Sequence, residues 1–300
     1  MRNLLSTKYQ RQLRLMETLI QHRDWLKLHE LADKLGCTER ILKSDLNELR
    51  AAFPTIDIQS SINGIMIDLE VNTSVEDVYQ YFLANSQSFQ LLEYIFFNEG
   101  LPIYRTIENL HSSNANLYRL GRNITKILSS QFQIELSFTP SEIRGNEIDI
   151  RYFFAQYFSE RYYFLDWPFP DLPEEDLTEF ADFFYKITNY PMRFSIYRMY
   201  KLMIAISIYR VKNGHFIDLP NNFYDEYYPL LMNIPNFEEI LGHFSEKFGL
   251  EITPDIIAQI FISFFQNNLF LDPQAFLNSL EENSEARYSY QLLSQILERL

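Results

Sequence analysis

The chain has 300 residues, which exceeds one ordinary domain and predicts two or three. Its formal net charge of −14 argues against nucleic-acid binding by the chain as a whole, because neutralising phosphates requires Lys and Arg. The charge is uneven, however: residues 1–50 hold ten Lys and Arg against seven Asp and Glu, whereas residues 151–300 hold eleven against twenty-one. This asymmetry indicates a DNA-binding front joined to an acidic region with a sensing or assembly role.

The composition excludes several classes of protein. The longest apolar run, Leu202–Tyr209, is flanked by Lys201 and Arg210, so we expect neither a signal peptide nor a membrane segment, and a cytoplasmic location. Cys37 is the only cysteine, which excludes an intrachain disulfide and a zinc site made of cysteines. With 8 Gly against 26 Phe and 20 Tyr, the sequence predicts a mainly α protein with large aromatic cores.

Residues 26–53 have the spacing of a helix-turn-helix, and an amphipathic helix over Thr7–His22 precedes them. Ala32 and Gly36 stand where the two helices would cross and where the chain would turn. A threonine follows that is placed to cap the second helix. The outward face of that helix mixes groups able to reach base edges and phosphates in a major groove. The DNA-binding candidates here are Thr38, Glu39, Arg40, Lys43, Ser44 and Asn47.

A hairpin completes this first unit. Pro54 ends the helix, and Asn63-Gly64 lies between two alternating apolar runs, which is a strong signal for a hairpin. Three helices followed by a hairpin describe a winged helix over residues 1–70. For the helix-turn-helix alone, the alternative is an ordinary helical hairpin, which is common in all-α proteins.

The same order of elements returns within residues 71–150. After helices between Asn72 and Asn98, a short helix over Ile103–Leu110, a polar turn and a longer helix over Asn114–Ser130 follow. An alternating strand over Gln131–Leu136 and a short return over Glu142–Arg144 complete a second winged helix, although the small crossing residue and the turn glycine are missing. The outward face of the longer helix is basic, and its DNA-binding candidates are Asn114, Asn116, Tyr118, Arg119, Arg122, Asn123 and Lys126. The alternative is a helical bridge with a basic surface stripe.

The remaining chain predicts helices near residues 174–189, 195–212, 222–232, 236–247, 255–270, 273–281 and 284–300. The expected fold is therefore mainly α, with two tandem winged helix-turn-helix domains that carry small β-hairpin wings, followed by an all-α helical bundle. The expected boundaries are 1–70, 71–150 and 151–300.

A family resemblance rests on the residues that follow the second hairpin. Two tandem winged helices, then Gly145-Asn146-Glu147, Ile150-Arg151-Tyr152 and Trp167-Pro168-Phe169, resemble the Mga family of transcriptional regulators of Gram-positive cocci and bacilli, over the whole chain. The resemblance implies a sequence-specific DNA-binding regulator, an activator, whose partner is double-stranded promoter DNA. It also implies RNA polymerase as a partner and a homo-oligomer.

The helical region of that family resembles a phosphotransferase-system regulation domain, in which phosphocarrier proteins of sugar transport phosphorylate histidines. His215 follows a helix end at Asn213-Gly214 and looks like the phosphorylated histidine of the family's first regulation domain, and His243 is a second candidate. A phosphoryl group there would add negative charge and shift a packing or dimer contact. A surface or capping histidine is the alternative for His215, and His243, which lies on a predicted amphipathic helix, is the weaker candidate. Typical members continue into further domains, so we expect a short or truncated member.

No catalytic signature is present, and the five histidines are scattered along the sequence. We therefore expect no enzyme activity, no cofactor and no metal site. Two classes of function remain: a DNA-binding transcription regulator, and a protein-interaction module whose winged helices bind protein partners.

Overall fold

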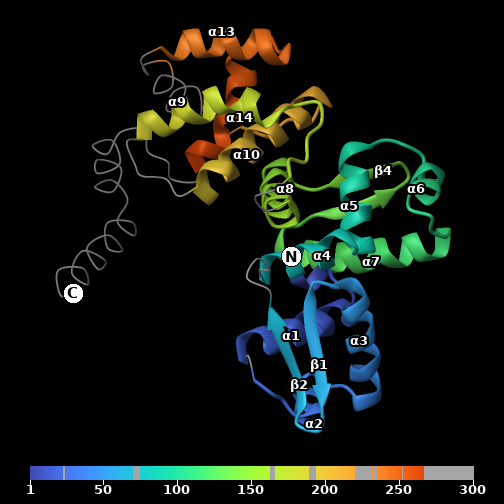
Figure 1. Ribbon diagram of the computed structural model, residues 1–300. Helices are drawn as coiled ribbons and strands as arrows, with labels where there is room; N and C mark the ends of the chain where they lie inside the picture. Colours follow the sequence, from blue (N-terminus) through green and yellow to red (C-terminus); the bar gives the residue numbers. More distant parts are fainter. Residues whose placement is uncertain are drawn as a thin grey trace, which may run out of the picture. The chain divides into compact units, whose positions relative to one another are not determined.

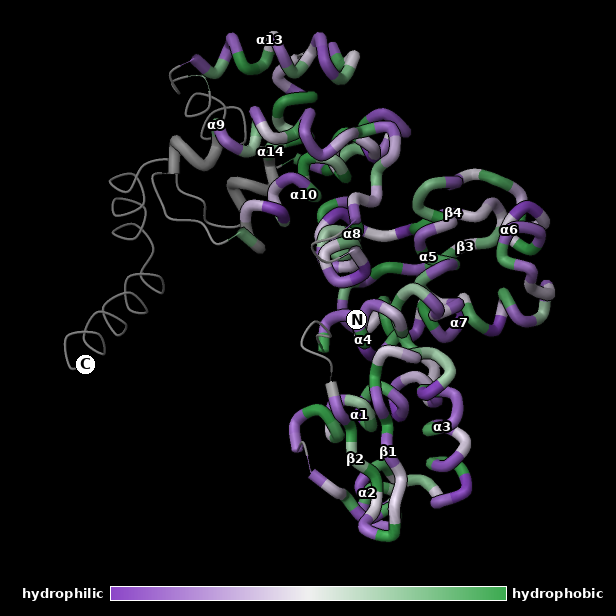
Figure 2. The backbone as a smooth tube through the Cα atoms, in the orientation of Figure 1, coloured by the Kyte–Doolittle hydropathy of each residue, from purple (hydrophilic) through white to green (hydrophobic). Residues whose placement is uncertain are grey.

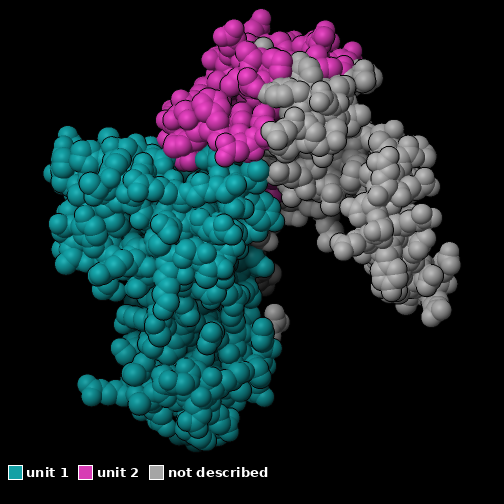
Figure 3. Space-filling model, turned by 180° about the vertical axis from the view of Figure 1, so that it is seen from behind, with its two compact units in different colours: residues 1–166 teal, residues 167–300 magenta. Residues whose placement is uncertain are grey.

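The computed structural model of the chain describes residues 1–22, 24–69, 75–162, 166–188, 194–219, 232, 236–251 and 253–266. Contacts divide the chain into two units, residues 1–166 and 167–300, which are coloured separately in Figure 3. The predicted helix cap at Asn72-Thr73-Ser74 and the predicted helices near 222–232, 273–281 and 284–300 lie wholly or almost wholly outside the described residues. The three domain boundaries expected from the sequence stay predictions.

The first 69 residues form three helices and a hairpin in the predicted order (Figure 1). After a short 3-10 turn η1 (Arg2–Leu4), the elements are α1 (Thr7–His22), α2 (Leu28–Lys34), α3 (Glu39–Ala52), β1 (Ile56–Ser61) and β2 (Gly64–Leu69). The apolar stripes of α1 and α3 face each other, so that Leu15, Met16 and Leu42 are fully buried. Figure 2 shows that hydrophilic and hydrophobic residues alternate repeatedly along α3, as expected of a helix with one buried and one exposed face.

The first hairpin is antiparallel, and its register pairs Ile58 with Ile67 and Ser61 with Gly64. Its side chains alternate as the sequence predicts, with Ile56 and Ile58 buried against the helices. Leu26 forms a single antiparallel β-bridge with Ile65 of β2: its N–H donates to the carbonyl of Ile65 at 2.9 Å, and its carbonyl accepts from the N–H of Ile65 at 2.8 Å. The unit is a complete winged helix.

A second set of the same elements follows α4 (Val75–Ala84). It consists of α5 (Gln87–Phe97), α6 (Ile103–Asn109), α7 (Asn114–Gln131), β3 (Glu135–Phe138) and β4 (Ser141–Arg144). The predicted strand over Gln131–Leu136 is wrong in its position: α7 continues through Gln131, and β3 begins only at Glu135. The reason is tertiary packing, because the ring of Phe132 lies against Phe153, with centroids 5.3 Å apart, and this holds the end of α7 on the following helix.

That helix, α8 (Glu147–Tyr162), belongs to the first unit. The hydroxyl of Tyr157 is fully buried and donates to the carbonyl of Phe89 at 2.8 Å and to Oε2 of Glu93 at 2.9 Å, which fastens α8 to α5. Burial, together with the adjacent Glu93 carboxylate, raises the pKa of Tyr157 well above its ordinary value, so this hydroxyl stays a hydrogen-bond donor. Close ring contacts among Phe96, Phe154 and Phe158 fill the space between the two helices.

In the second unit the described helices are η2 (Glu174–Leu177), α9 (Thr178–Thr188), α10 (Phe194–Lys212), α13 (Phe237–Phe248) and α14 (Pro254–Gln266). Phenylalanine rings from α9, α13 and α14 meet at Phe180, Phe244 and Phe261. The buried side-chain amide of Gln259 bonds both the N–H and the carbonyl of Ile217, at 2.6 and 2.8 Å, so the segment after α10 is held to α14. Together with the two small hairpins, this confirms the predicted fold class.

Candidate nucleic-acid interface

The first helix-turn-helix has the geometry that its sequence predicts. Gly36 turns the chain with φ of +62°, and the hydroxyl of Thr38 accepts from the N–H of Ile41 at 3.3 Å to cap α3. The candidates on the recognition helix α3, namely Glu39, Arg40, Lys43, Ser44 and Asn47, are all exposed. The positive charge of this face is modest, because the carboxylate of Glu39 lies 4.0 Å from the ammonium group of Lys43.

The second helix-turn-helix repeats the first with each residue number raised by 75. In the turn of the first motif the backbone N–H of Cys37 donates to the carbonyl of Ala32 at 3.0 Å. In the turn of the second motif the backbone N–H of Ser112 donates to the carbonyl of Ile107 at 3.1 Å. Ser113 caps α7 as Thr38 caps α3, and each side chain accepts from the backbone N–H of the residue three positions further on. The place of Gly36 is taken by His111, whose φ of +45° gives the same left-handed turn without glycine.

The outward face of α7 is basic, as the sequence predicts. Arg119, Arg122 and Lys126 are exposed, and no acidic residue occurs anywhere in α7. Asn116 differs from its prediction as an outward residue, because it is half-buried and its amide bonds Ser112 at 2.9 Å and Arg119 at 2.7 Å. It therefore orients Arg119 and stiffens the start of the helix. The other candidates, Asn114, Tyr118 and Asn123, are exposed.

The first winged helix has a groove between α3 and the hairpin that the sequence did not reveal. A cavity of about 300 Å³ lies there, lined by Lys43, Asn47, Arg50 and Ser60 among others. The guanidinium of Arg50 donates to the carbonyl of Ile58 at 2.9 Å and to the hydroxyl of Ser60, so it joins the recognition helix to the wing. The only signal in the sequence was an arginine in the last turn of a helix followed by a serine-rich hairpin.

In the second winged helix the corresponding groove is closed. The ring of Phe138 covers Gly121, where an added Cβ would lie 2.3 Å from the ring. The hydroxyl of Thr125, which takes the place of Arg50 in the repeat, accepts from the N–H of Leu136 at 3.0 Å. Tyr118 also packs edge-on against Phe138, with centroids 5.2 Å apart. The second wing is thus packed onto its own recognition helix.

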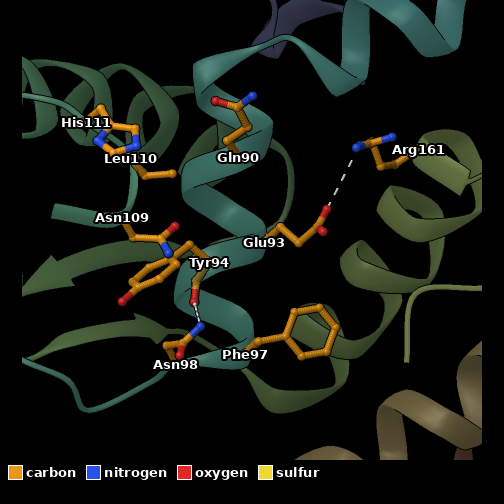
Figure 4. A pocket seen from close by; sticks show the side chains of 9 residues that line it. All are labelled: Gln90, Glu93, Tyr94, Phe97, Asn98, Asn109, Leu110, His111 and Arg161. Atoms are coloured by element: carbon orange, nitrogen blue, oxygen red, sulfur yellow. Dashed lines mark hydrogen bonds and ion pairs between the residues drawn. The ribbon is translucent and has the colours of Figure 1, made fainter. Parts of the chain in front are cut away.

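A separate cavity of about 500 Å³ adjoins the second turn (Figure 4). Its lining includes His111, Tyr94, Asn98, Glu93 and Arg161, and Figure 4 shows Glu93 pointing toward Arg161. The two charges are 4.0 Å apart, and Glu93 also accepts from the hydroxyl of a second tyrosine in α8, Tyr162. No residue of this cavity was a site candidate from the sequence.

The two candidate histidines lie in the second unit and differ in their surroundings. His215 is half-buried, and its backbone N–H donates to the carbonyl of Arg210 at 3.0 Å. His243 is exposed on α13, and its Nδ1 lies 2.8 Å from Oε1 of Glu179 on α9. That carboxylate raises the pKa of His243 above its ordinary value.

Neither a metal site nor a membrane helix is found in the part of the chain that the structure describes. Among the described residues, no three or more His, Cys, Asp or Glu side chains are placed so that they could hold a metal ion, and no described helix combines the length and the apolar character that crossing a bilayer requires.

Three family models match the chain in consecutive order. The M protein trans-acting positive regulator (MGA) HTH domain matches residues 6–65, the Mga helix-turn-helix domain matches 71–158, and the M protein trans-acting positive regulator (MGA) PRD domain matches 173–300. The chain belongs to the Mga family. The predicted resemblance is confirmed, and because these models describe a regulator, so is the prediction that this Mga-family chain is not an enzyme.

Two relatives support the assignment to the Mga family. A protein of Streptococcus pneumoniae serotype 4, named "putative trans-acting regulator", is 40% identical over 301 residues, which cover 100% of this chain and 61% of the relative. The capsule synthesis positive regulator AcpA of Bacillus anthracis is 23% identical over 211 residues, covering 68% of this chain and 43% of AcpA. This chain therefore matches 61% or less of the length of these two relatives.

Proposed function

We propose that this chain binds double-stranded promoter DNA through both winged helices and regulates transcription, as an activator. The observation that carries the proposal is the repeated helix-turn-helix, whose second recognition helix presents Arg119, Arg122 and Lys126 without any acidic neighbour on α7. Such a face supplies the phosphate neutralisation that the acidic chain as a whole lacks. The family membership and the relative named as a positive regulator support the same function.

The two recognition helices would contribute differently. The charges of α7 would mainly bind phosphates and set the register of the chain on DNA, while Asn114 and Tyr118 reach toward base edges. On α3, the exposed Arg40 and Asn47 carry the groups suited to reading bases, and Thr38 and Ser44 to phosphates. The second winged helix is expected to supply at least as much of the DNA affinity as the first.

The test is the dependence of DNA binding on salt and on charge. The chain of 300 residues is titrated with fluorescent promoter fragments, and bound fragments are selected from a random pool to find the preferred sequence. Replacing Arg119, Arg122 and Lys126 by alanine should weaken binding at all sequences and reduce the slope of log affinity against log salt by about 2–3, since each phosphate contact contributes about 0.9.

A matched pair of variants separates a contact from a general charge effect. Arg122→Glu and Arg14→Glu change the net charge equally, and Arg14 is exposed on α1, outside both recognition helices. We expect a large loss of affinity only for Arg122→Glu. Equal losses for both would remove α7 from the interface, and unchanged affinity after replacing Arg40 and Lys43 would remove α3 from it. Binding of a protein partner without DNA affinity would favour the protein-interaction alternative.

Modulation through the second unit is a further part of this proposal. Hydrogen bonding of Nδ1 of His243 to Glu179 leaves Nε2 as the ring nitrogen that faces outward, which suits phosphoryl transfer to that nitrogen. His215 keeps its place as a candidate because it follows the left-handed Gly214 at a helix end. Incubation with phosphocarrier proteins followed by mass spectrometry tests both, with His243→Ala and His215→Ala as controls; an unmodified chain would defeat this part alone.

Assembly and partners complete the proposal. A homo-oligomer and contact with RNA polymerase are expected of a promoter-bound activator, at a cytoplasmic location. Sedimentation of the chain with and without promoter DNA measures the first, and transcription in a purified system measures the second. A monomer that still activates would show that oligomerisation is not required.

A further inference from the structure

The tip of the first wing exposes an apolar side chain almost completely. Ile62 is 97% exposed, whereas the other exposed large hydrophobic residues among those described reach at most 63%. Its neighbours Ser60, Ser61 and Asn63 are polar but uncharged, so Ile62 is the one large apolar side chain of the turn. A fully solvated isoleucine at the end of a protruding hairpin contributes nothing to the core of this unit.

The tip is nevertheless held rigidly. The hydroxyl of Ser61 accepts from the N–H of Asn63 at 3.0 Å within the turn. Directly behind the turn, Gly64 lies so close to Leu26 that an added Cβ would be 2.1 Å from the carbonyl oxygen of that residue. Arg50 fixes the strand β1 to the recognition helix through Ile58 and Ser60. The position of Ile62 is therefore set with respect to α3.

Cationic side chains surround this apolar tip. Lys27 is exposed and its Nζ lies 3.5 Å from the carbonyl oxygen of Ile62. Lys43 and Arg50 line the adjoining groove. In a duplex, phosphates border a groove whose floor is made of base edges, so an apolar residue between cations matches that arrangement.

We propose that Ile62 inserts into the minor groove of the bound promoter and wedges between base pairs, so that the first wing bends the DNA while α3 occupies the neighbouring major groove. The inference rests on the proposed function, since it requires that the first winged helix binds DNA. Wedging costs base stacking, and the bent duplex repays that cost by meeting more protein surface. A single side chain buries far less than the roughly 1,200–2,000 Å² of a stable protein interface, which argues against a protein contact at the tip alone.

The second wing cannot act in the same way. Its strands have four residues each against six in the first wing, which shortens its reach by about 7 Å at about 3.3 Å per residue. Its large apolar residue, Phe138, is turned inward onto Gly121. The bend should therefore depend on the first wing only.

The experiment uses the chain of 300 residues and measures the bend angle of a selected promoter duplex by energy transfer between dyes at the two ends of the duplex. Ile62→Ala should lose about half or more of the bend and about tenfold of the affinity, because the wedge is removed while the charges remain. Ile62→Met, which keeps a long apolar side chain, should retain both. Tyr152→Ala removes another exposed apolar side chain, 44% exposed on α8, and should change neither.

The outcomes separate this inference from the proposed function. If the wild-type chain binds but Ile62→Ala bends DNA with the same angle and affinity, the wedge is refuted and the proposed function stands. If Ile62→Ala changes sedimentation in the absence of DNA and leaves the bend unchanged, the tip is a protein contact and the inference is wrong. If the wild-type chain binds no duplex, the proposed function fails, and the inference with it. Hydrogen exchange of the hairpin should be the same in all variants, which excludes misfolding of the wing as the cause.

Discussion

Removing the carboxylate of Asp45 tests how the first recognition helix is anchored. Asp45 is 2% exposed on the inner side of α3, and its two oxygens accept from Arg11 of α1 at 2.6 and 3.1 Å and from Gln12 at 3.0 Å. Asp45→Ala leaves the partly buried guanidinium of Arg11 without its acceptor, whereas the amide of Gln12 keeps its bond to Oε2 of Glu48 at 2.9 Å. Breaking a buried pair in this way costs about 3–5 kcal/mol, and because the Arg11 side chain is 19% exposed and can turn partly to water, we expect about 2–3 kcal/mol.

The repeat supplies the control for this prediction. Leu120 stands in the second winged helix where Asp45 stands in the first, and it is buried, so an apolar residue already occupies this position in one copy of the repeat. The double variant Arg11→Met with Asp45→Leu should recover most of the lost stability, since a hydrophobic replacement of both partners is often neutral or stabilising.

Hydrogen exchange of peptides from α1 and α3 is the suitable assay, because a single melting temperature would mix the two units of the chain. If the unit of residues 1–166 melted separately, a loss of about 2–3 kcal/mol would lower its melting temperature by about 5–10 °C. A cost below about 1 kcal/mol for Asp45→Ala, or a double variant no more stable than the single one, would refute the reasoning.

Three further predictions follow from glycine contacts and from the exposed histidine. Gly121→Ala should displace Phe138 and cost about 1–3 kcal/mol, seen as faster hydrogen exchange in β3 and β4; Phe138→Leu in the same chain should restore part of it, and unchanged exchange would contradict the contact. Gly64→Ala should destabilise the first wing, because its φ is +129° and its Cβ would overlap the backbone of Leu26, whereas Gly242→Ala on the exposed face of α13 should be neutral or slightly stabilising by denaturant titration. Glu179→Gln should lower the pKa of His243 measured by NMR; since Glu179 raises that pKa in the folded chain, the contribution of this contact is complete below the ordinary histidine pKa, about 6.5, and is lost as pH rises through the raised value. An identical titration curve in Glu179→Gln would show that the contact is not formed in solution.

The sequence predicts helices well here because their signals are local. Periodic leucines and a capping Thr38 define α3, and Asn63-Gly64 defines the first hairpin. The second strand pair was misplaced because the same alternation of apolar and polar residues continues from the end of α7 into β3. At the end of the helix Phe132 contacts Phe153, which is distant in sequence, and Gln133 turns the chain with a left-handed φ of +55°.

The candidate site was predictable in its exposed residues and not in its supports. The outward positions of Arg119 and Arg122 follow directly from helical periodicity. The role of Arg50, by contrast, depends on where the carbonyl of Ile58 and the hydroxyl of Ser60 come to lie, which only the folded hairpin determines. Asn116 was placed on the outward face by periodicity, but a hydrogen bond to Ser112 draws its amide back to the cap.

His111 shows that two helix-turn-helix units can share a backbone conformation at the turn while the residue there differs. A side chain in the left-handed region costs about 1–3 kcal/mol relative to a relaxed conformation, which a unit with a well-packed core can absorb. A search pattern that demands glycine at this turn would therefore overlook the second copy, although its hydrogen bonds repeat those of the first. The two copies in this chain are better recognised by the hydrogen bonds that their turns make than by the residues at those turns.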